Sequence, residues 1–372
     1  MTAARDWTWA IVVLDLRGVR SAVRSAVSSG AEPRRPYTRL VGSGLAIVHV
    51  NDIAWVASTL QAAQRRRGDT VDLIDPPKPG ASLRWPWKVL SIALRLPILA
   101  GTALAIRRRG YAIAHVHYAT QALVGLLCTR PFVVHCHGTD VRGVVSGSLR
   151  GRALRALLRP AALVVYSTPD LEIDARSVRS DAQFLPNPID VATFAPAGPR
   201  SRDLLVGVRL DPVKGAETAI VAIELLLHDR PATTVTVVAS GLLAPAARAR
   251  LGGRVSFVEP RRHPDMPQLL ASHRVALGQF RLGILSQFEL ESMACGTPIV
   301  ATFRYAAAYD KPPPMEEASE PQAIARAVVG LLEDHERWER LARDGREWVI
   351  AHHDSDAIAA RLDRLYRRAL AS

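Results

Sequence analysis

Short apolar segments alternate with longer amphipathic segments along most of this chain, beginning at Gly44. Residues 45–50 are predicted to form a buried strand, a helix follows up to Arg67, and residues 70–74 form the next strand. A strand, a helix and a strand in this order make a βαβ unit, so the opening predicts a parallel sheet. Further strands are expected at residues 113–117, 132–136, 163–166 and 183–185.

A second series of strands and helices follows a stretch rich in proline, residues 186–201, which we interpret as an interdomain linker. The expected strands are 204–208, 233–239, 255–258, 275–279 and 299–301, with helices at 215–228, 244–250, 265–272 and 287–295. Amphipathic helices then close the chain at 322–332, 336–349 and 356–370. The pattern predicts an α/β protein with two doubly wound parallel sheets facing a cleft, which binds its ligands beyond the strand carboxyl ends.

The domain boundaries follow from the linker. We expect a first domain at residues 44–195, a second at 196–353, and a C-terminal helix at 354–372 that packs back towards the first. Residues 1–43 are rich in arginine and serine and do not continue the pattern, so they are interpreted as a loosely attached extension.

Composition narrows the class of protein. The chain of 372 residues is long enough for two full cores, and 48% hydrophobic with 6% aromatic residues suits an α/β protein packed by small aliphatic side chains. The net charge of +13 predicts attraction to anionic surfaces or phosphorylated substrates. Nothing resembles a recognition helix or an aromatic and basic platform, so no nucleic-acid partner is expected.

The cysteines and the length of the apolar segments indicate the cellular compartment. Cys128, Cys136 and Cys295 lie in apolar contexts without a CxxC pair, which is typical of reduced thiols in a cytoplasmic protein. No run reaches the roughly 20 uncharged apolar residues that span a bilayer. Residues 83–109 combine tryptophans with a basic end, which fits either shallow contact with an anionic membrane or a buried helix with a basic C-terminus.

The second half contains groups suited to a nucleoside diphosphate. Arg209 and Lys214 flank a proline turn between a strand and a helix, where they can grip a diphosphate or simply belong to a solvated turn. The turn 283–286 leads into a helix, whose free N–H groups suit an anion. Glu289 has capping-box spacing from the turn, whereas Glu291 has not and is free to accept hydrogen bonds from ribose hydroxyls.

These motifs together resemble a known family. Residues 186–190 with Phe194, Arg209 with Lys214, and residues 291–298 resemble, in order and spacing, the retaining glycosyltransferases of family 4, over about residues 44–370. The resemblance implies a GT-B architecture, with a nucleotide sugar held by the C-terminal domain and an acceptor by the N-terminal one. It also implies that Arg209 and Lys214 bind the donor diphosphate and stabilise the leaving group, and that Glu291 holds the ribose.

One position departs from that family. The family usually has a glutamate eight positions before Glu291, and here that position is Gly283. The resemblance therefore implies that this loop contacts sugar and phosphate through backbone N–H groups instead, namely those of Gly283, Ile284, Leu285 and Ser286.

The first half supplies matching residues. Asn51 lies where the family's donor-facing loop lies, although it and the next residue also suit a helix cap. His137 matches the family histidine near the transferred sugar, and such a histidine can donate a hydrogen bond or help move a proton. Asp140 and Arg142 either orient His137 and meet the acceptor, or form an ion pair or a cap.

Histidines at two strand ends raise the question of a metal. His115 and His117 share one face of their strand, and His135 and His137 share one face of theirs. Zinc needs side chains that meet at one point, and the pattern fits unrelated strand-end histidines equally well. No metal and no cofactor are expected.

The sequence thus predicts a metal-independent glycosyltransferase that moves a sugar from a nucleoside diphosphate sugar to the hydroxyl of a glycan, lipid or small molecule. Its expected place is the cytoplasm, with an anionic membrane surface as a further partner. Two alternatives stay open. One is a nucleotide-sugar epimerase or phosphorylase on the same fold, and the other is a nucleotide-sugar-binding protein with weak catalysis, which Gly283 suggests.

Overall fold

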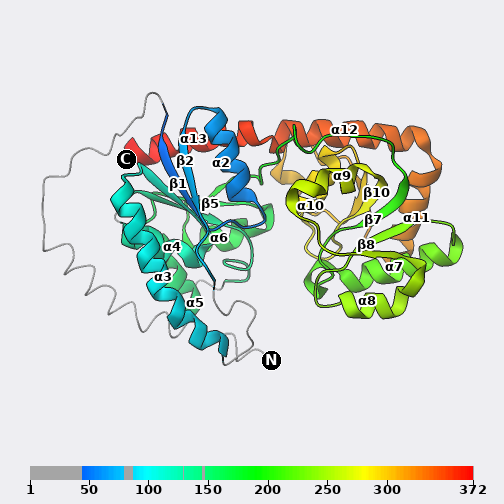
Figure 1. Ribbon diagram of the computed structural model, residues 1–372, viewed down its shortest axis with the longest axis horizontal. Coiled ribbons are helices and arrows are strands. Elements are labelled where there is room, and N and C mark those ends of the chain that lie inside the picture. Colours follow the sequence, from blue (N-terminus) through cyan, green and yellow to red (C-terminus); the bar gives the residue numbers. More distant parts are fainter. Residues whose placement is uncertain (1–43, 79–86, 129, 145–146, 372) are drawn as a thin grey trace, which may run out of the picture. The chain divides into compact units, whose positions relative to one another are not determined.

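The computed structural model describes residues 44–78, 87–128, 130–144 and 147–371. The expectation for residues 1–43 lies outside this part of the chain. The chain divides into two compact units, one made of Met1–Pro186 with Ile358–Ser372 and the other of Asn187–Ala357. Each unit is built on a parallel sheet with helices on both sides (Figure 1).

The sheet of the first unit has the strand order β2-β1-β3-β4-β5-β6, and every pair is parallel. Its strands are β1 (Ala46–Val50), β2 (Thr70–Ile74), β3 (Ile113–His117), β4 (Phe132–Cys136), β5 (Leu163–Tyr166) and β6 (Gln183–Phe184). The connecting helices are α2 (Val56–Arg66), α3 (Trp87–Arg109), α4 (Ala122–Cys128), α5 (Leu149–Leu158) and α6 (Glu172–Val178). The strand order reverses between β1 and β3, so their carboxyl ends flank the position where such sheets bind ligands.

The sheet of the second unit has the order β12-β11-β10-β7-β8-β9, again parallel throughout. Its strands are β7 (Arg202–Val206), β8 (Val235–Val238), β9 (Ser256–Val258), β10 (His273–Leu277), β11 (Ile299–Ala301) and β12 (Glu316–Glu317). The helices are α7 (Ala216–Asp229), α8 (Ala244–Leu251), α9 (Met266–Ala271), α10 (Gln287–Ala294), α11 (Pro321–Glu333) and α12 (His335–His353). Here the order reverses between β7 and β10, which places the loops after these strands at the second ligand-binding position.

The last helix, α13 (Ser355–Ala371), packs on the first unit. Its apolar residues Ile358, Leu362 and Tyr366 are buried in one cluster with strand residues such as Ile47 and Ile113. Since burying a large aliphatic side chain contributes about 1.5–3 kcal/mol, this face holds the end of the chain on the first sheet.

The boundary between the units falls after Pro186 and not after residue 195. The reason is that the expected linker folds into the second unit. Ile189 is buried in a core cluster of that unit and forms a bridge with Asp354, and the Asn187 carbonyl lies 2.8 Å from Nδ1 of His353.

Helix α3 bears on the two interpretations of residues 83–109, of which 83–86 lie outside the described residues. Ala103 and Ile106 are buried against the helix α4, which covers one face, while Leu104 and the terminal arginines Arg107 to Arg109 stay exposed. Within the described part of the chain, none of the helices combines the length and apolarity that crossing a membrane requires.

Candidate functional site

Two loops of the second unit are joined at the reversal point of its sheet. One follows β7 and ends at Gly215, and the other follows β10 and runs to Ser286. The N–H of Phe280 donates to the Lys214 carbonyl at 3.0 Å. Gly215 has a φ of 79°, and an added Cβ would lie 3.1 Å from the Cβ of Phe280. Only glycine fits this backbone closely against the neighbouring loop, so the sequence Lys214-Gly215 fixes where the lysine lies.

The two cations predicted to bind the diphosphate lie in the first of these loops. Arg209 is 71% exposed in its side chain and pairs with Asp211 at 2.6 Å. Asp211 is itself held in place, because its Oδ1 accepts the N–H of Leu242 at 2.8 Å. Lys214 is half-buried at the end of a 3₁₀ turn. An exposed ion pair contributes at most about 1 kcal/mol, so a diphosphate can readily take the guanidinium from Asp211.

The second loop offers backbone donors. Among the described residues, the N–H groups of Gly283, Ile284 and Leu285 have no hydrogen-bond partner. The N–H of Ser286 differs, because it donates to Oε2 of Glu289 at 3.0 Å. Three of the four predicted N–H groups are thus available to an anion, and the fourth is already used inside the protein.

Gly283 has a physical reason to be glycine in this chain. Its φ is 69°, and an added Cβ would lie 2.8 Å from Cγ and 2.9 Å from Cδ of Arg304. The N–H of Arg304 donates to the Gly283 carbonyl at 2.9 Å, which keeps the two residues together. The stem of Arg304 therefore fills the space into which the family's glutamate would begin.

The capping box predicted at the start of α10 is confirmed. Glu289 is fully buried, and its Oε1 also accepts the N–H of Gln279 at 2.8 Å. The carboxylate therefore ties the helix to the end of the β10 loop. Since buried backbone N–H groups are costly to leave unpaired, Glu289 has a structural role and is excluded as a residue that binds the sugar donor.

Glu291 is the other carboxylate of α10, and it is buried as well. Its Oε1 lies 2.7 Å from Nε2 of His263, and its side chain is only 4% exposed. Burial raises the pKa of Glu291, which the hydrogen bonds from His263 and Gln287 oppose. The sequence analysis missed His263, which lies in a turn before α9 far from Glu291 in sequence and carries no motif that marks it.

In the first unit, Asn51 lies at the reversal point of the sheet. Its Nδ2 donates to the His117 carbonyl at 2.8 Å, and its φ is 72°. Asp52, not Asn51, supports the first turn of helix α2, because its Oδ1 accepts the N–H of Ala57 at 3.0 Å. All non-glycine residues with positive φ in the described part of the chain follow β1 or β3: Asn51, Ala54, Trp55 and Tyr118. Such strained backbone is concentrated at functional sites, which marks this edge of the sheet.

His137 follows β4 at the same edge and ends a chain of hydrogen-bonded side chains. Its Nε2 lies 3.0 Å from Nδ1 of His117, and Nε2 of His117 lies 2.9 Å from Nδ1 of His49. Nε2 of His49 in turn lies 2.7 Å from Oε1 of Gln64. Withdrawal from water lowers the pKa of His137 to about 3, so this imidazole is neutral at physiological pH. It can therefore act as a neutral hydrogen-bonding group and not as a cation.

Asp140 and Arg142 do not form a pair with each other. Asp140 is buried, and its two oxygens accept the backbone N–H groups of Ala119, His137 and Gly138 at 2.7–3.2 Å. Arg142 instead pairs with Asp170 at 2.6 Å. Of the readings left open for them, the structure places Asp140 as the anchor of the His137 backbone and Arg142 in an ion pair.

A family described as glycosyl transferase-like matches residues 223–364, which is less than half of the chain and lies mostly in the second unit. A search of curated protein sequences finds no match.

Solved structures give a wider likeness. HepE of Anabaena in complex with UDP-glucose is 16% identical, with a TM-score of 0.67 over 86% of this chain and 98% of that one. Sucrose-phosphate synthase from Thermosynechococcus elongatus is 17% identical, with a TM-score of 0.67 over 88% and 99%. The catalytic domain of starch synthase IV from Arabidopsis thaliana, bound to ADP and acarbose, is 13% identical, with a TM-score of 0.63 over 88% and 100%. The predicted fold is confirmed: this chain has the GT-B fold, with two Rossmann-like domains.

Proposed function

We propose that this protein is a retaining glycosyltransferase of the family 4 type, which moves a sugar from a nucleoside diphosphate sugar to an acceptor hydroxyl without a metal ion at the diphosphate. One observation carries the proposal. At the reversal point of the second sheet, the loop with Arg209 and Lys214 is bonded to the loop that offers the N–H groups of Gly283, Ile284 and Leu285. HepE with UDP-glucose and starch synthase IV with ADP support a nucleotide-sugar donor.

The two cations account for the departure of the leaving group. When the bond from the sugar to the diphosphate breaks, negative charge grows on the phosphate oxygens. Arg209 contacts them as a planar fork and Lys214 as a compact charge, which stabilises the transition state more than the bound donor. The three backbone N–H groups of the neighbouring loop add fixed dipoles, and they replace the family's glutamate at Gly283.

The ribose is assigned to Glu291. Its Oε1 lies 2.7 Å from Nε2 of His263, which fixes the carboxylate that is proposed to accept hydrogen bonds from the ribose hydroxyls. His263 is then a positioning residue that fixes the carboxylate. In a Glu291→Gln variant, a raised KM for the nucleotide-sugar donor with little change in kcat would support this role. If the variant only loses folded protein, Glu291 and His263 form a structural pair instead.

In the first unit, His137 is proposed to face the reacting sugar and the acceptor hydroxyl. Its neutral imidazole donates or accepts one hydrogen bond there, and Asp140 fixes the backbone that presents it. Asn51 is proposed to contact the nucleotide-sugar donor through its Oδ1. This oxygen is buried without a hydrogen-bond partner among the described residues.

The acceptor is proposed to be a glycan or a lipid-linked molecule at an anionic membrane surface in the cytoplasm. The exposed arginines at the end of α3 and the exposed Leu104 support this part of the proposal. Sedimentation with vesicles that contain acidic lipid tests it. Arg107→Glu with Arg108→Glu should reduce binding several-fold at low salt, and equal binding to neutral vesicles would contradict the proposal.

An activity assay separates transfer from the alternatives. The full chain is incubated with UDP-, ADP- and GDP-sugars, with and without a panel of sugar and lipid acceptors, and products are followed by proton NMR. Transfer with retention gives an acceptor product whose anomeric configuration equals that of the donor. Consumption of the donor alone indicates an epimerase, dependence on inorganic phosphate indicates a phosphorylase, and binding without turnover indicates a catalytically weak binding protein.

Arg209→Ala and Lys214→Ala are expected to lower kcat by about 10²–10³-fold while the fold is kept, because each removes charge stabilisation from the leaving group. Arg248→Ala is the matched control, since Arg248 pairs with Glu259 on the surface. Near-normal turnover in either variant would contradict the role of that residue in stabilising the leaving group.

A further inference from the structure

A row of histidines crosses one face of the first sheet. His49 lies on β1, His115 and His117 lie on β3, and His135 lies on β4. Register pairs His49 with His115 and His117 with His135, and alternation along β3 puts its two histidines on the same face. All of these side chains are fully buried. The sequence analysis identified the last three together with His137 and missed His49.

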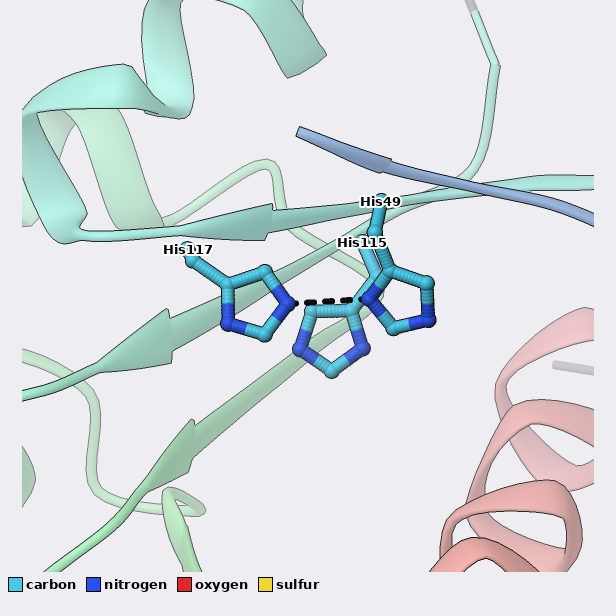
Figure 2. Close-up of side chains that lie close together, drawn as sticks. All are labelled: His49, His115 and His117. Carbon is cyan, nitrogen blue, oxygen red and sulfur yellow. Dashed lines mark hydrogen bonds between the residues drawn. The ribbon is translucent and has the colours of Figure 1, made fainter. Parts of the chain in front are cut away.

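Within this row, His49, His115 and His117 each bring one ring nitrogen to within 4.8 Å of the others. The ring of His115 lies beside the hydrogen-bonded pair of His49 and His117, as Figure 2 shows. Nδ1 of His49 and Nε2 of His117 already face each other at 2.9 Å. Nitrogens around a tetrahedral zinc ion lie about 3.3 Å apart. The ring of His115 is stacked on that of His117 at 12°, so it has to turn its lone pair towards the other two nitrogens for the triad to bind one ion.

The other nitrogen of each ring has a partner of its own. Nε2 of His49 bonds to Oε1 of Gln64 at 2.7 Å, and Nδ1 of His117 bonds to Nε2 of His137 at 3.0 Å. Nδ1 of His115 bonds to the hydroxyl of Tyr366 on α13. Histidines that bind metals characteristically donate their second N–H to an acceptor in this way, which fixes the tautomer and leaves one lone pair for the metal.

The second ring nitrogen of His115 is the one that lacks a partner in the described part of the chain. Its Nε2 is buried and has no hydrogen-bond partner among the described residues. A buried polar atom without a partner is costly, and a metal ion at this position would satisfy it.

We propose that His49 Nδ1, His115 Nε2 and His117 Nε2 bind one divalent transition-metal ion of the zinc type inside the first unit. Imidazole ligands suit Zn²⁺, Co²⁺, Ni²⁺ and Cu²⁺ and exclude Mg²⁺ and Ca²⁺. Three neutral imidazoles leave the ion's charge uncompensated, so the fourth position takes a hydroxide or a small anion.

A second triad shares one member with the first, and its chemistry is less suitable. His117, His135 and His137 also bring ring nitrogens within 4.8 Å of one another. However, neither nitrogen of His135 has a hydrogen-bond partner among the described residues, so nothing fixes its tautomer for a metal. His135 is therefore the matched control, a buried histidine of the same row outside the proposed site.

Metal binding at this site would change which ring nitrogen of His137 carries the proton. When His117 binds the ion through Nε2, its single proton sits on Nδ1 and is donated to Nε2 of His137. The proton of His137 is then on Nδ1, so the nitrogen away from His117 is a hydrogen-bond donor. Without the ion, the amide of Gln64 sets the donor-to-acceptor direction along this row of hydrogen-bonded side chains. Nδ1 of His137 can then be an acceptor.

The test uses the full chain after chelator treatment. Competition with a chromophoric chelator is expected to show one tightly bound Zn²⁺ per chain, and Co²⁺ is expected to give the intense visible absorption of a tetrahedral site. His115→Gln should weaken Zn²⁺ binding at least tenfold and abolish that absorption, whereas His135→Gln should leave both within twofold of the wild type. Circular dichroism checks that each variant is folded.

If His115→Gln does not fold, Tyr366→Phe takes its place. This variant removes only the acceptor behind His115 and is expected to weaken Zn²⁺ binding about tenfold. The proposal is overturned by a wild-type chain that gives only the weak spectrum of octahedral Co²⁺. It is also overturned if His135→Gln loses Zn²⁺ while His115→Gln keeps it, since the ion then belongs to the second triad.

Discussion

At the residue scale, Gly283 decides how this protein differs from the family it resembles. The position combines a left-handed backbone with the stem of Arg304 packed where a side chain would start. The missing glutamate is therefore part of a different local packing, and not a simple deletion of one contact. The free N–H groups of the same loop follow from that backbone, which is why they are proposed to replace the carboxylate.

Gly283→Glu is expected to lower the free energy of unfolding by about 1–3 kcal/mol and to leave transfer activity no higher, because the new side chain meets strain and Arg304. Urea denaturation measures the loss. Adding Arg304→Ala should recover the steric part but not the cost of the positive φ. A single variant as stable as the wild type and more active would show that the loop adapts freely.

At the element scale, helix α10 has carboxylates with separate tasks. Glu289 closes the capping box and holds Gln279, whereas Glu291 is paired with His263 on another face. Spacing alone was enough to separate the two, because a capping box is a local relation between positions three apart. The helix N-terminus is consequently fixed to the β10 loop before any ligand binds.

Glu289→Ala is expected to cost about 2–4 kcal/mol of unfolding free energy, since it leaves the buried N–H of Gln279 and the half-buried N–H of Ser286 without an acceptor. Glu259→Ala is the control, because Glu259 is exposed and its loss should cost less than about 0.5 kcal/mol. The measurement is chemical denaturation followed by circular dichroism. A Glu289 variant that matches the control would show that the cap contributes little.

Local patterns also predicted most strands, because strand alternation and βα order are encoded in neighbouring residues. Contacts between distant segments were not accessible in the same way. His263 reaches Glu291 from another loop, Arg142 reaches Asp170, and the hydroxyl of Tyr366 reaches His115 from the last helix. His49 was missed as well, although it lies in a predicted strand and pairs in register with His115.

At the scale of the whole molecule, the stretch that looked like a linker belongs to the second unit. Nδ1 of His353, at the end of α12, donates to the Asn187 carbonyl, and its Nε2 lies 3.2 Å from the hydroxyl of Tyr309. Prolines suggested a flexible connection, yet buried hydrogen bonds and the packing of Ile189 fix this segment. The chain then leaves α12 and returns to the first unit as α13.

His353 makes stability depend on pH. Burial lowers its pKa to about 4, against about 6.5 in the unfolded chain, so the unfolded state binds more protons below pH 6.5. Its contribution is complete above pH 6.5 and is lost as pH falls towards 4. The free energies of unfolding of the wild type and His353→Gln should therefore converge by about 3 kcal/mol between pH 7 and 4. Parallel pH profiles would contradict this assignment.

The joined loops of the second unit are proposed to bind a nucleoside diphosphate. Isothermal titration of the full chain with UDP, ADP, GDP and UDP-glucose measures this binding without knowledge of the acceptor. One-to-one binding of at least one of these nucleotides is expected, weakened at least tenfold (about 1.4 kcal/mol) by Lys214→Ala and unchanged by Arg248→Ala. Binding that Lys214→Ala leaves intact, or no binding of any of them, would contradict it.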